Sequence, residues 1–182
     1  KVWNDLVASS EGSGFMQSWE WSEFKEAEGA KVERLGIFDG GKLIAGAIVY
    51  RVDTTLGVSP LAMPHGPVLP WHEPARAEAC FDLLKEKLAE LAGRSGSPVA
   101  RFEPFICARP AFLGAALRAP LDLVPTPTLL VRLGGGDEDM LGAMTQKGRY
   151  NIRIAERKGV EVVSSGTNDL NGDFHELFEL TC

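Results

Sequence analysis

The sequence has few of the residues that build metal centres and disulfide frameworks. Its three cysteines stand far apart without a C-x-x-C pair, and its three histidines show no H-x-x-x-H spacing. A zinc site or a disulfide framework would need such clusters. No histidine accompanies a nucleophile elbow, so a Ser-His-Asp triad has no support either. We therefore expect reduced thiols, and neither a metal nor a cofactor.

Long apolar runs are also absent. The longest, residues 43–50, is far shorter than the roughly 20 residues that cross a bilayer as a helix. The sequence shows no charged and then apolar leader of the secretory kind. We expect a cytoplasmic protein, and peripheral association with the inner face of the membrane stays an open alternative.

The charge is distributed unevenly along the chain. The 182 residues are 45% hydrophobic and 24% charged, a composition typical of a globular domain that buries one substantial core. Residues 144–159 carry five Lys/Arg and one Glu, which leaves 14 basic and 24 acidic residues elsewhere. A concentrated basic segment on an acidic body predicts a local contact with an anion.

The order of periodic segments predicts an α+β fold in which helices cover a mixed sheet. We expect a hairpin of residues 32–38 and 43–52, a short strand and shaped turn within 60–69, and a helix from Pro74 that ends at Gly93. The other expected helices are 17–28, 111–117, one from 138 capped by Asp137, the basic segment, and one from 174. The other expected strands are 99–103, 128–133 and 160–165.

Four motifs occur in a fixed order along the chain. They are Phe15-Met16-Gln17-Ser18 with Trp21 and Lys25, His65-Gly66-Pro67-Val68, Arg101-Phe102-Glu103-Pro104, and QKGRYNIRIAERKGV at residues 146–160. In this order and spacing they resemble the Fem family of enzymes that build peptidoglycan interpeptide bridges. The resemblance covers the chain from about Phe15 to Val163, and the last motif is the most distinctive.

The resemblance implies two acetyltransferase-like (GNAT-like) domains, residues 1–134 and the start of a second at 135–182, with a boundary at the glycine triplet 134–136. It also implies that an amino acid passes from aminoacyl-tRNA to the stem-peptide amine of a UDP-linked or lipid-linked peptidoglycan precursor. Much of the precursor site of the family lies in the second domain, so we expect these residues alone to be inactive. The amino acid ester of the tRNA is already activated, so the chemistry mainly requires placement of the amine and stabilisation of the oxyanion.

Lys25 and Glu103 match functional positions of the family. The resemblance implies that Lys25 lies near the precursor phosphates, where a compact ammonium suits a diphosphate. Its alternative is an ordinary solvated lysine on a helix face. Glu103 matches an acidic position considered as a proton acceptor, although the family often has Asp there. A salt bridge with Arg101 is the alternative for Glu103.

Two further segments carry candidate binding residues. His65 and Gly66 are candidates for the precursor site, although the segment can equally serve to fix the backbone shape, with Gly66 allowing close approach of another chain. Four basic residues are candidates to contact tRNA phosphates: the three arginines are spaced i, i+4 and i+8 along one helix face, and the lysine, with Lys158, widens that stripe; their alternative is a solvated face. They are Lys147, Arg149, Arg153 and Arg157. Trp19 and Trp21 are candidates to stack on a base or sugar, or to belong to the core.

Two other functions compete with this one. The first is an acyl-CoA-dependent N-acetyltransferase, which shares the implied fold but cradles the cofactor pyrophosphate on a glycine-rich turn before a helix. The chain has no such turn, because the triplet 134–136 lacks the basic lead and spacing. The second is a domain that binds a precursor or a partner without catalysis.

Overall fold

A computed structural model of the chain describes residues 1–54, 57–120, 122, 124–125, 131–132, 134–164 and 171–181. Contacts between Cα atoms divide the chain into two compact units, Lys1–Pro127 and Thr128–Cys182. Among the residues described, no helix is long and apolar enough to cross a membrane. Cys80 and Cys107 are free thiols.

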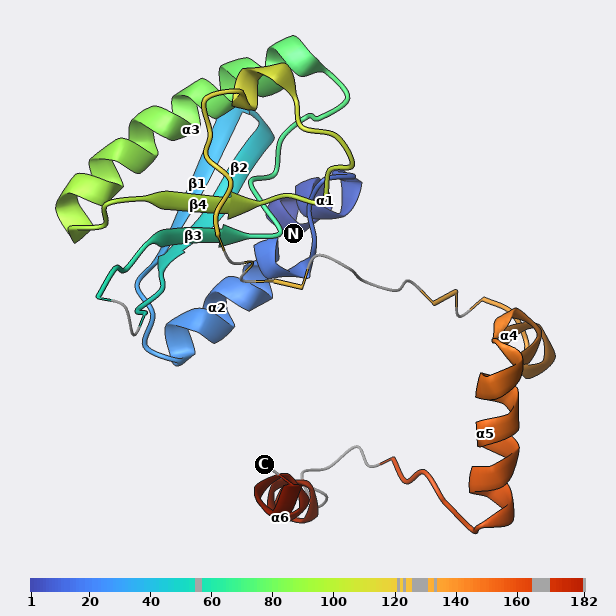
Figure 1. Cartoon of the computed structure of the whole chain (residues 1–182). Helices are drawn as coiled ribbons and strands as arrows, with labels where there is room; N and C mark the ends of the chain where they lie inside the picture. The colour runs from blue at the N-terminus through green and yellow to red at the C-terminus, as the bar shows by residue number, and fades with distance from the viewer. Residues whose placement is uncertain are drawn as a thin grey trace. The chain divides into compact units, whose positions relative to one another are not determined.

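The first unit is built on a four-stranded sheet with the order β1-β2-β3-β4 (Figure 1). The strands are β1 (Val32–Asp39), β2 (Lys42–Arg51), β3 (Leu61–Pro64) and β4 (Ala100–Glu103). The first three are antiparallel, and β4 runs parallel to β3. The hairpin reverses at Gly40 and Gly41, whose φ angles of 55° and 82° favour glycine. The predicted α+β fold with a mixed sheet is therefore confirmed.

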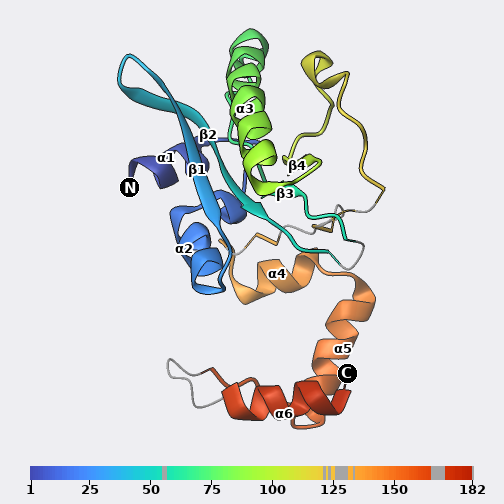
Figure 2. The same ribbon diagram turned by 90° about the vertical axis from the view of Figure 1, so that its left-hand side faces the viewer.

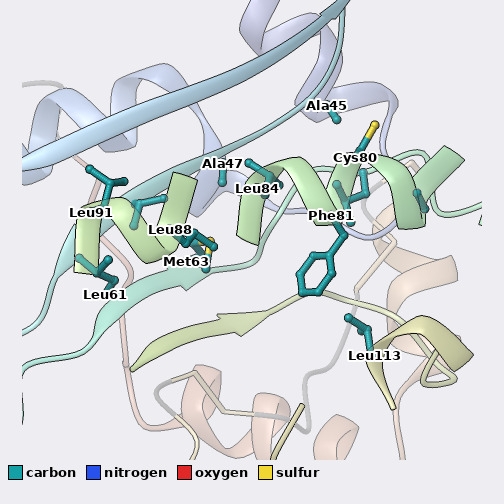
Figure 3. Close-up of a cluster of buried hydrophobic side chains, with 13 residues drawn as sticks. Ala45, Ala47, Leu61, Met63, Cys80, Phe81, Leu84, Leu88, Leu91 and Leu113 are labelled. Carbon is teal, nitrogen blue, oxygen red and sulfur yellow. The ribbon is translucent and has the colours of Figure 1, made fainter. Parts of the chain in front are cut away.

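Helix α3 (Pro74–Ser95) covers one face of the sheet. Its buried residues recur at helical spacing and pack on the inward residues of β2 and β3, as Figure 3 shows for Phe81, Leu84 and Met63. The predicted end at Gly93 is wrong, because the helix continues through that residue. Gly96, with a φ of 66°, is the residue that ends it.

Three short helices cover the other face: α1 (Val2–Ser9), the 3-10 helix η1 (Phe15–Gln17) and α2 (Trp19–Ala27) (Figure 2). Trp3 and Val7 of α1 form a second core cluster with buried residues of β2 that point away from α3, among them Ile48 and Tyr50. The helix predicted over 17–28 begins later, because the Ser18 side chain accepts a hydrogen bond from the Trp21 N–H and caps α2.

The described part of the second unit consists of α4 (Asp137–Ala143), α5 (Gln146–Arg157) and α6 (Asn171–Thr181). Asp137 is not the cap of α4; Gly136 precedes the helix, and its cap makes no side-chain hydrogen bond. Residues 160–164 of the strand predicted at 160–165 form no strand, since no residue that the structure describes pairs with them. The strand predicted at 128–133 lies outside the described residues except at 131 and 132, which are not in a strand. The helix predicted at 111–117 is a single 3-10 turn, η2 (Ala111–Leu113).

Candidate functional site

The buried side chain of Gln17 lies between β2 and β3, at the point where the two strands separate beside the candidate site. Strands β2 and β3 pair at Tyr50 and Arg51, and the next bridge between the two segments joins Gly46 to Val68. Gln17 fills the interval: its Oε1 accepts from Ile48 N–H at 2.8 Å, and its Nε2 donates to the Ile48 and Pro64 carbonyls at 3.3 and 2.8 Å. The fully buried amide thus replaces the missing rungs of the ladder.

The turn after β3 is fixed from three sides. The Gly14 N–H donates to the His65 carbonyl at 3.3 Å, and the Glu103 N–H donates to the Gly66 carbonyl at 3.1 Å. Gly66 is buried, and a Cβ added there would lie 2.5 Å from Cδ of Gln17. Gly66 thus permits the close approach that the sequence suggested, and the approaching group is the Gln17 amide.

Four ring side chains from separate segments form a continuous series, which we call the aromatic row: Trp21, Phe15, His65 and Phe105. Successive ring centroids are 5.3, 5.3 and 4.2 Å apart. Phe15 is 61% exposed and Phe105 is 46% exposed, whereas His65 between them is buried. The row therefore presents apolar ring surface to solvent on both sides of a polar ring.

Lys25 lies at the Trp21 end of the aromatic row. Its Nζ is 5.9 Å from the Trp21 ring and 5.5 Å from the Tyr50 ring, and 2.5 Å from Glu28 Oε2. Lys25 lines a pocket of about 380 Å³ that also contains Arg51, and Glu28 and Asp53 line the same pocket as the ion-pair partners of Lys25 and Arg51. The Lys25 ammonium thus stands over aromatic rings at the edge of a polar pocket, where an anion would take the place of the Glu28 carboxylate.

Glu103 lies at the Phe105 end of the row, at the last position of β4. Its Oε1 accepts from Arg101 Nε at 2.6 Å, and its Oε2 accepts from the Val124 N–H at 3.0 Å. The salt bridge with Arg101 that the sequence offered as the alternative is therefore present. The carboxylate of Glu103 is held in one orientation by these two partners.

His65 has unusual backbone and electrostatic properties. Its φ of 55° lies in the left-handed region, which few residues other than glycine adopt. Burial lowers the pKa of its imidazole, and the nearby Glu103 carboxylate opposes that shift. Its Nδ1 is buried without a hydrogen-bond partner. A buried and unpaired polar atom on a strained backbone is typical of a functional position.

Of the two tryptophan candidates, Trp21 belongs to the aromatic row and Trp19 lies apart from it. Trp19 has the Arg34 guanidinium 4.6 Å above its ring, and Trp21 packs against the second core cluster. Trp19 also lines a larger pocket, of about 950 Å³, between α1 and the β1–β2 hairpin, which contains neither Lys25 nor His65.

The basic residues on α5 differ in their surroundings. The Arg149 guanidinium donates to the carbonyls of Leu141 and Gly142 at 3.2 and 3.4 Å, and to that of Met144. These carbonyls end α4, so Arg149 joins the two helices. Lys147, Arg153 and Arg157 are exposed. Arg157 also donates from Nε to the Arg153 carbonyl at 3.2 Å.

A comparison with known protein families identifies the family of this chain. The chain has an α+β fold with a mixed sheet covered on both faces. The model of the FemAB family matches residues 2–109, which is more than half of the chain. The chain therefore belongs to the FemAB family.

A crystal structure of FemX shares the fold. Its sequence is 18% identical, the TM-score is 0.73, and the match covers 98% of this chain and 47% of the FemX chain. This chain thus spans about half the length of the structure that it matches. No curated protein sequence matches it significantly.

Sequence reasoning missed two residues of the site. Gln17 was noticed within a motif but received no role, although a glutamine between apolar segments is a signal for a buried polar network. Phe105 carried no signal, because a single aromatic residue after a strand is common. Its importance depends on His65 and Phe15, which are distant in sequence.

Proposed function

We propose that this chain is part of an enzyme that transfers an amino acid from aminoacyl-tRNA to the stem-peptide amine of a peptidoglycan precursor. The observation that carries the proposal is the aromatic row, which has Lys25 at its Trp21 end and, at the other end, Phe105, two residues after Glu103. Lys25 and the Glu103 carboxylate thus lie toward opposite ends of one apolar surface. This arrangement suits a long ligand that carries a phosphate at one end.

The chemical groups of the precursor match the residues along the aromatic row. Its diphosphate would lie at Lys25, beside the pocket that also holds Arg51. The apolar faces of sugar and peptide groups would cover Phe15 and Phe105, whose rings are exposed. Both a UDP-linked muropeptide and a lipid-linked precursor carry the diphosphate, so the aromatic row suits either acceptor.

At the far end, Glu103 would orient the acceptor amine and accept its proton as the amine attacks the ester carbonyl of the aminoacyl-tRNA. The new amide bond forms, the ester bond breaks, and the tRNA leaves with its ribose hydroxyl restored. Arg101 and the Val124 N–H hold the carboxylate in place for this role. Placement of two reactants supplies much of the rate in such a reaction.

The second unit provides candidate contacts for the tRNA. We propose that residues 1–134 form a GNAT-like domain, that 135–182 begin a second one, and that the exposed Lys147, Arg153 and Arg157 contact tRNA phosphates. Arg149 would support them indirectly, because it ties α5 to α4. Since FemX is about twice as long, we expect these 182 residues to bind the precursor without completing the transfer.

The acetyl-CoA alternative receives no support from the sheet, because the buried Gln17 amide fills the interval where β2 and β3 separate. Acetyltransferases of this fold bind the cofactor across a split between two strands. Here the parallel strands β3 and β4 stay paired from Leu61 to Pro64, and the Glu103 N–H continues the contact to the Gly66 carbonyl. We therefore expect no specific binding of acetyl-CoA.

A transfer assay tests the proposal. The full-length protein is incubated with a UDP-linked muropeptide and aminoacyl-tRNA, and the mass of the muropeptide is then measured by mass spectrometry. We expect the mass of one amino acid residue to be added, with no addition when the tRNA is deacylated beforehand. Acetylation of the muropeptide from acetyl-CoA in the absence of tRNA would overturn the proposal.

A further inference from the structure

We infer that His65 binds the precursor as a neutral imidazole, donating a hydrogen bond from Nε2–H to a carbonyl or carboxylate oxygen of the stem peptide. The inference rests on the proposed function, and it assigns a specific atom, tautomer and ligand group to the centre of the aromatic row. His65 is in this sense a binding and positioning residue, and Glu103 remains the proton acceptor.

The surroundings of the ring decide which nitrogen carries the proton. Nδ1 is enclosed without any partner, and a Cβ added at Gly14 would lie only 2.6 Å from it. A hydrogen on Nδ1 would therefore point at protein without an acceptor, and buried N–H groups without an acceptor are rarer in proteins than buried acceptors without a donor. The proton belongs on Nε2, and Nε2 is the nitrogen that is left to meet a ligand.

The same enclosure keeps the ring neutral. An imidazolium would carry hydrogen on both nitrogens, and Nδ1 has no acceptor to receive it. The groups packed on the ring are the phenyl rings of Phe15 and Phe105 and the backbone of Gly14, none of which is charged. Glu103 is the charged group that acts on His65, and its attraction is weaker than the effect of burial.

The ligand class follows from the two flanking rings. Phe15 and Phe105 stand exposed on either side of one hydrogen-bond donor, so the position suits an oxygen set between apolar groups, as in a peptide. A phosphate would instead favour the ammonium of Lys25 at the other end of the row. Because Nε2 has no lone pair in this tautomer, His65 cannot take the proton of the amine there.

Backbone geometry supports a positioning role. The φ of 55° at His65 is maintained by hydrogen bonds to both neighbouring segments, from Gly14 N–H to the His65 carbonyl and from Glu103 N–H to the Gly66 carbonyl. A residue other than glycine keeps such a conformation only where its surroundings dictate it. The ring is thus placed by the backbone before any ligand arrives.

Nitrogen-15 NMR of the ring tests the inference on the unaltered protein. We expect the Nε2–H tautomer of His65 between pH 6 and 8, and we expect a UDP-linked muropeptide to shift both His65 Nε2 and the Trp21 indole. UDP alone should shift the Trp21 indole and leave His65 unchanged. His72, whose ring is exposed, serves as the reference that no ligand should shift.

Two variants provide a second measurement by calorimetry. His65→Gln keeps an N–H at the end of the side chain, and His65→Leu removes it. We expect His65→Leu to weaken muropeptide binding about fivefold, with His65→Gln recovering most of the loss, since one hydrogen bond contributes about 1 kcal/mol. Binding of UDP alone should be the same in the parent and both variants.

The outcomes separate the inference from the proposed function. If the muropeptide shifts the Trp21 indole but not His65, or if the proton lies on Nδ1, the inference is wrong and the proposed function stands. If the muropeptide shifts neither residue, the proposed function is wrong and the inference falls with it.

Discussion

At the scale of single residues, Gln17 has the largest structural task of any polar side chain in the site. It satisfies the Ile48 N–H and the carbonyls of Ile48 and Pro64 where β2 and β3 separate, and its backbone carbonyl accepts from the Trp3 indole at 2.7 Å. The turn that places His65 begins directly after Pro64. Gln17 therefore supports the site without facing a ligand.

Replacement of Gln17 by alanine should destabilise the fold strongly. Three buried backbone groups would lose their partner, and we expect the free energy of unfolding to fall by about 2–4 kcal/mol. Urea denaturation measures this change. Gln146→Ala is the matched control, because Gln146 is exposed, and it should stay within about 0.5 kcal/mol of the parent. Equal effects of the two substitutions would contradict the role given to Gln17.

His65 should make stability depend on pH. Its pKa is lowered from the ordinary value of 6.5 in the folded state, so the unfolded chain binds a proton first as the pH falls. Stability from the neutral ring is fully present above pH 6.5 and is lost as the pH falls from there towards the lowered folded pKa. Asparagine tolerates the left-handed conformation, so we expect His65→Asn to lose less stability than the parent between pH 7 and 5. Urea denaturation at pH 7 and pH 5 measures the loss of stability in each protein. An identical loss in the parent and in His65→Asn would count against a buried neutral imidazole.

At the scale of elements, the sequence predicted the hairpin and α3 well and the second unit poorly. Alternating apolar residues and paired glycines define β1 and β2, and a recurring apolar face defines α3. Residues 160–164 show the same apolar character as a strand, but a strand also needs a partner, which local sequence cannot supply. Similarly, the motifs located Lys25, His65 and Glu103, whereas the aromatic row that connects them depends on tertiary contacts.

The end of α3 offers a test with two glycines. A Cβ at Gly93 would meet no atom within 4 Å, whereas Gly96 has the left-handed φ of 66° that ends the helix. We expect Gly93→Ala to stabilise the protein by about 0.5–1 kcal/mol and Gly96→Ala to destabilise it by about 1 kcal/mol. Thermal unfolding of both variants measures the difference. If Gly93→Ala destabilised the protein and Gly96→Ala stabilised it, Gly93 rather than Gly96 would be the residue that ends the helix.

The basic helix α5 offers a second comparison between like residues. Arg149 donates to the carbonyls that end α4, whereas the Arg153 side chain makes no hydrogen bond or ion pair within the described residues. We expect Arg149→Ala to lower the helical circular dichroism of the protein and Arg153→Ala to leave it unchanged. In tRNA titrations, Arg153→Ala should flatten the salt dependence by about 0.7–0.9 log units per log unit of salt.

An unchanged salt dependence of tRNA binding in Arg153→Ala would make the face of α5 a solvated surface. A loss of helical signal in Arg153→Ala equal to that in Arg149→Ala would show a structural role for both arginines. Either result would leave the roles proposed for Lys25, His65 and Glu103 untouched, because those three residues belong to the first unit.

At the scale of the whole molecule, the residues that stabilise the sheet differ from the residues proposed to bind a ligand. The two core clusters and Gln17 fix the sheet, and the aromatic row follows from the segments that this framework holds together. Family membership concerns residues 2–109, which contain every residue of the row as well as Lys25 and Glu103. The central claim is therefore that this region binds a diphosphate-bearing precursor with Lys25 at its phosphate end.

Calorimetry with a UDP-linked muropeptide tests this claim most directly. Lys25→Ala should weaken binding roughly tenfold or more, because hydrogen bonds to charged groups contribute about 1.5–3 kcal/mol. Lys31→Ala is the matched control, since Lys31 is exposed in the segment between α2 and β1 and the variant should bind like the parent. The account is contradicted if Lys25→Ala binds the muropeptide as tightly as the parent, or if both substitutions weaken binding equally.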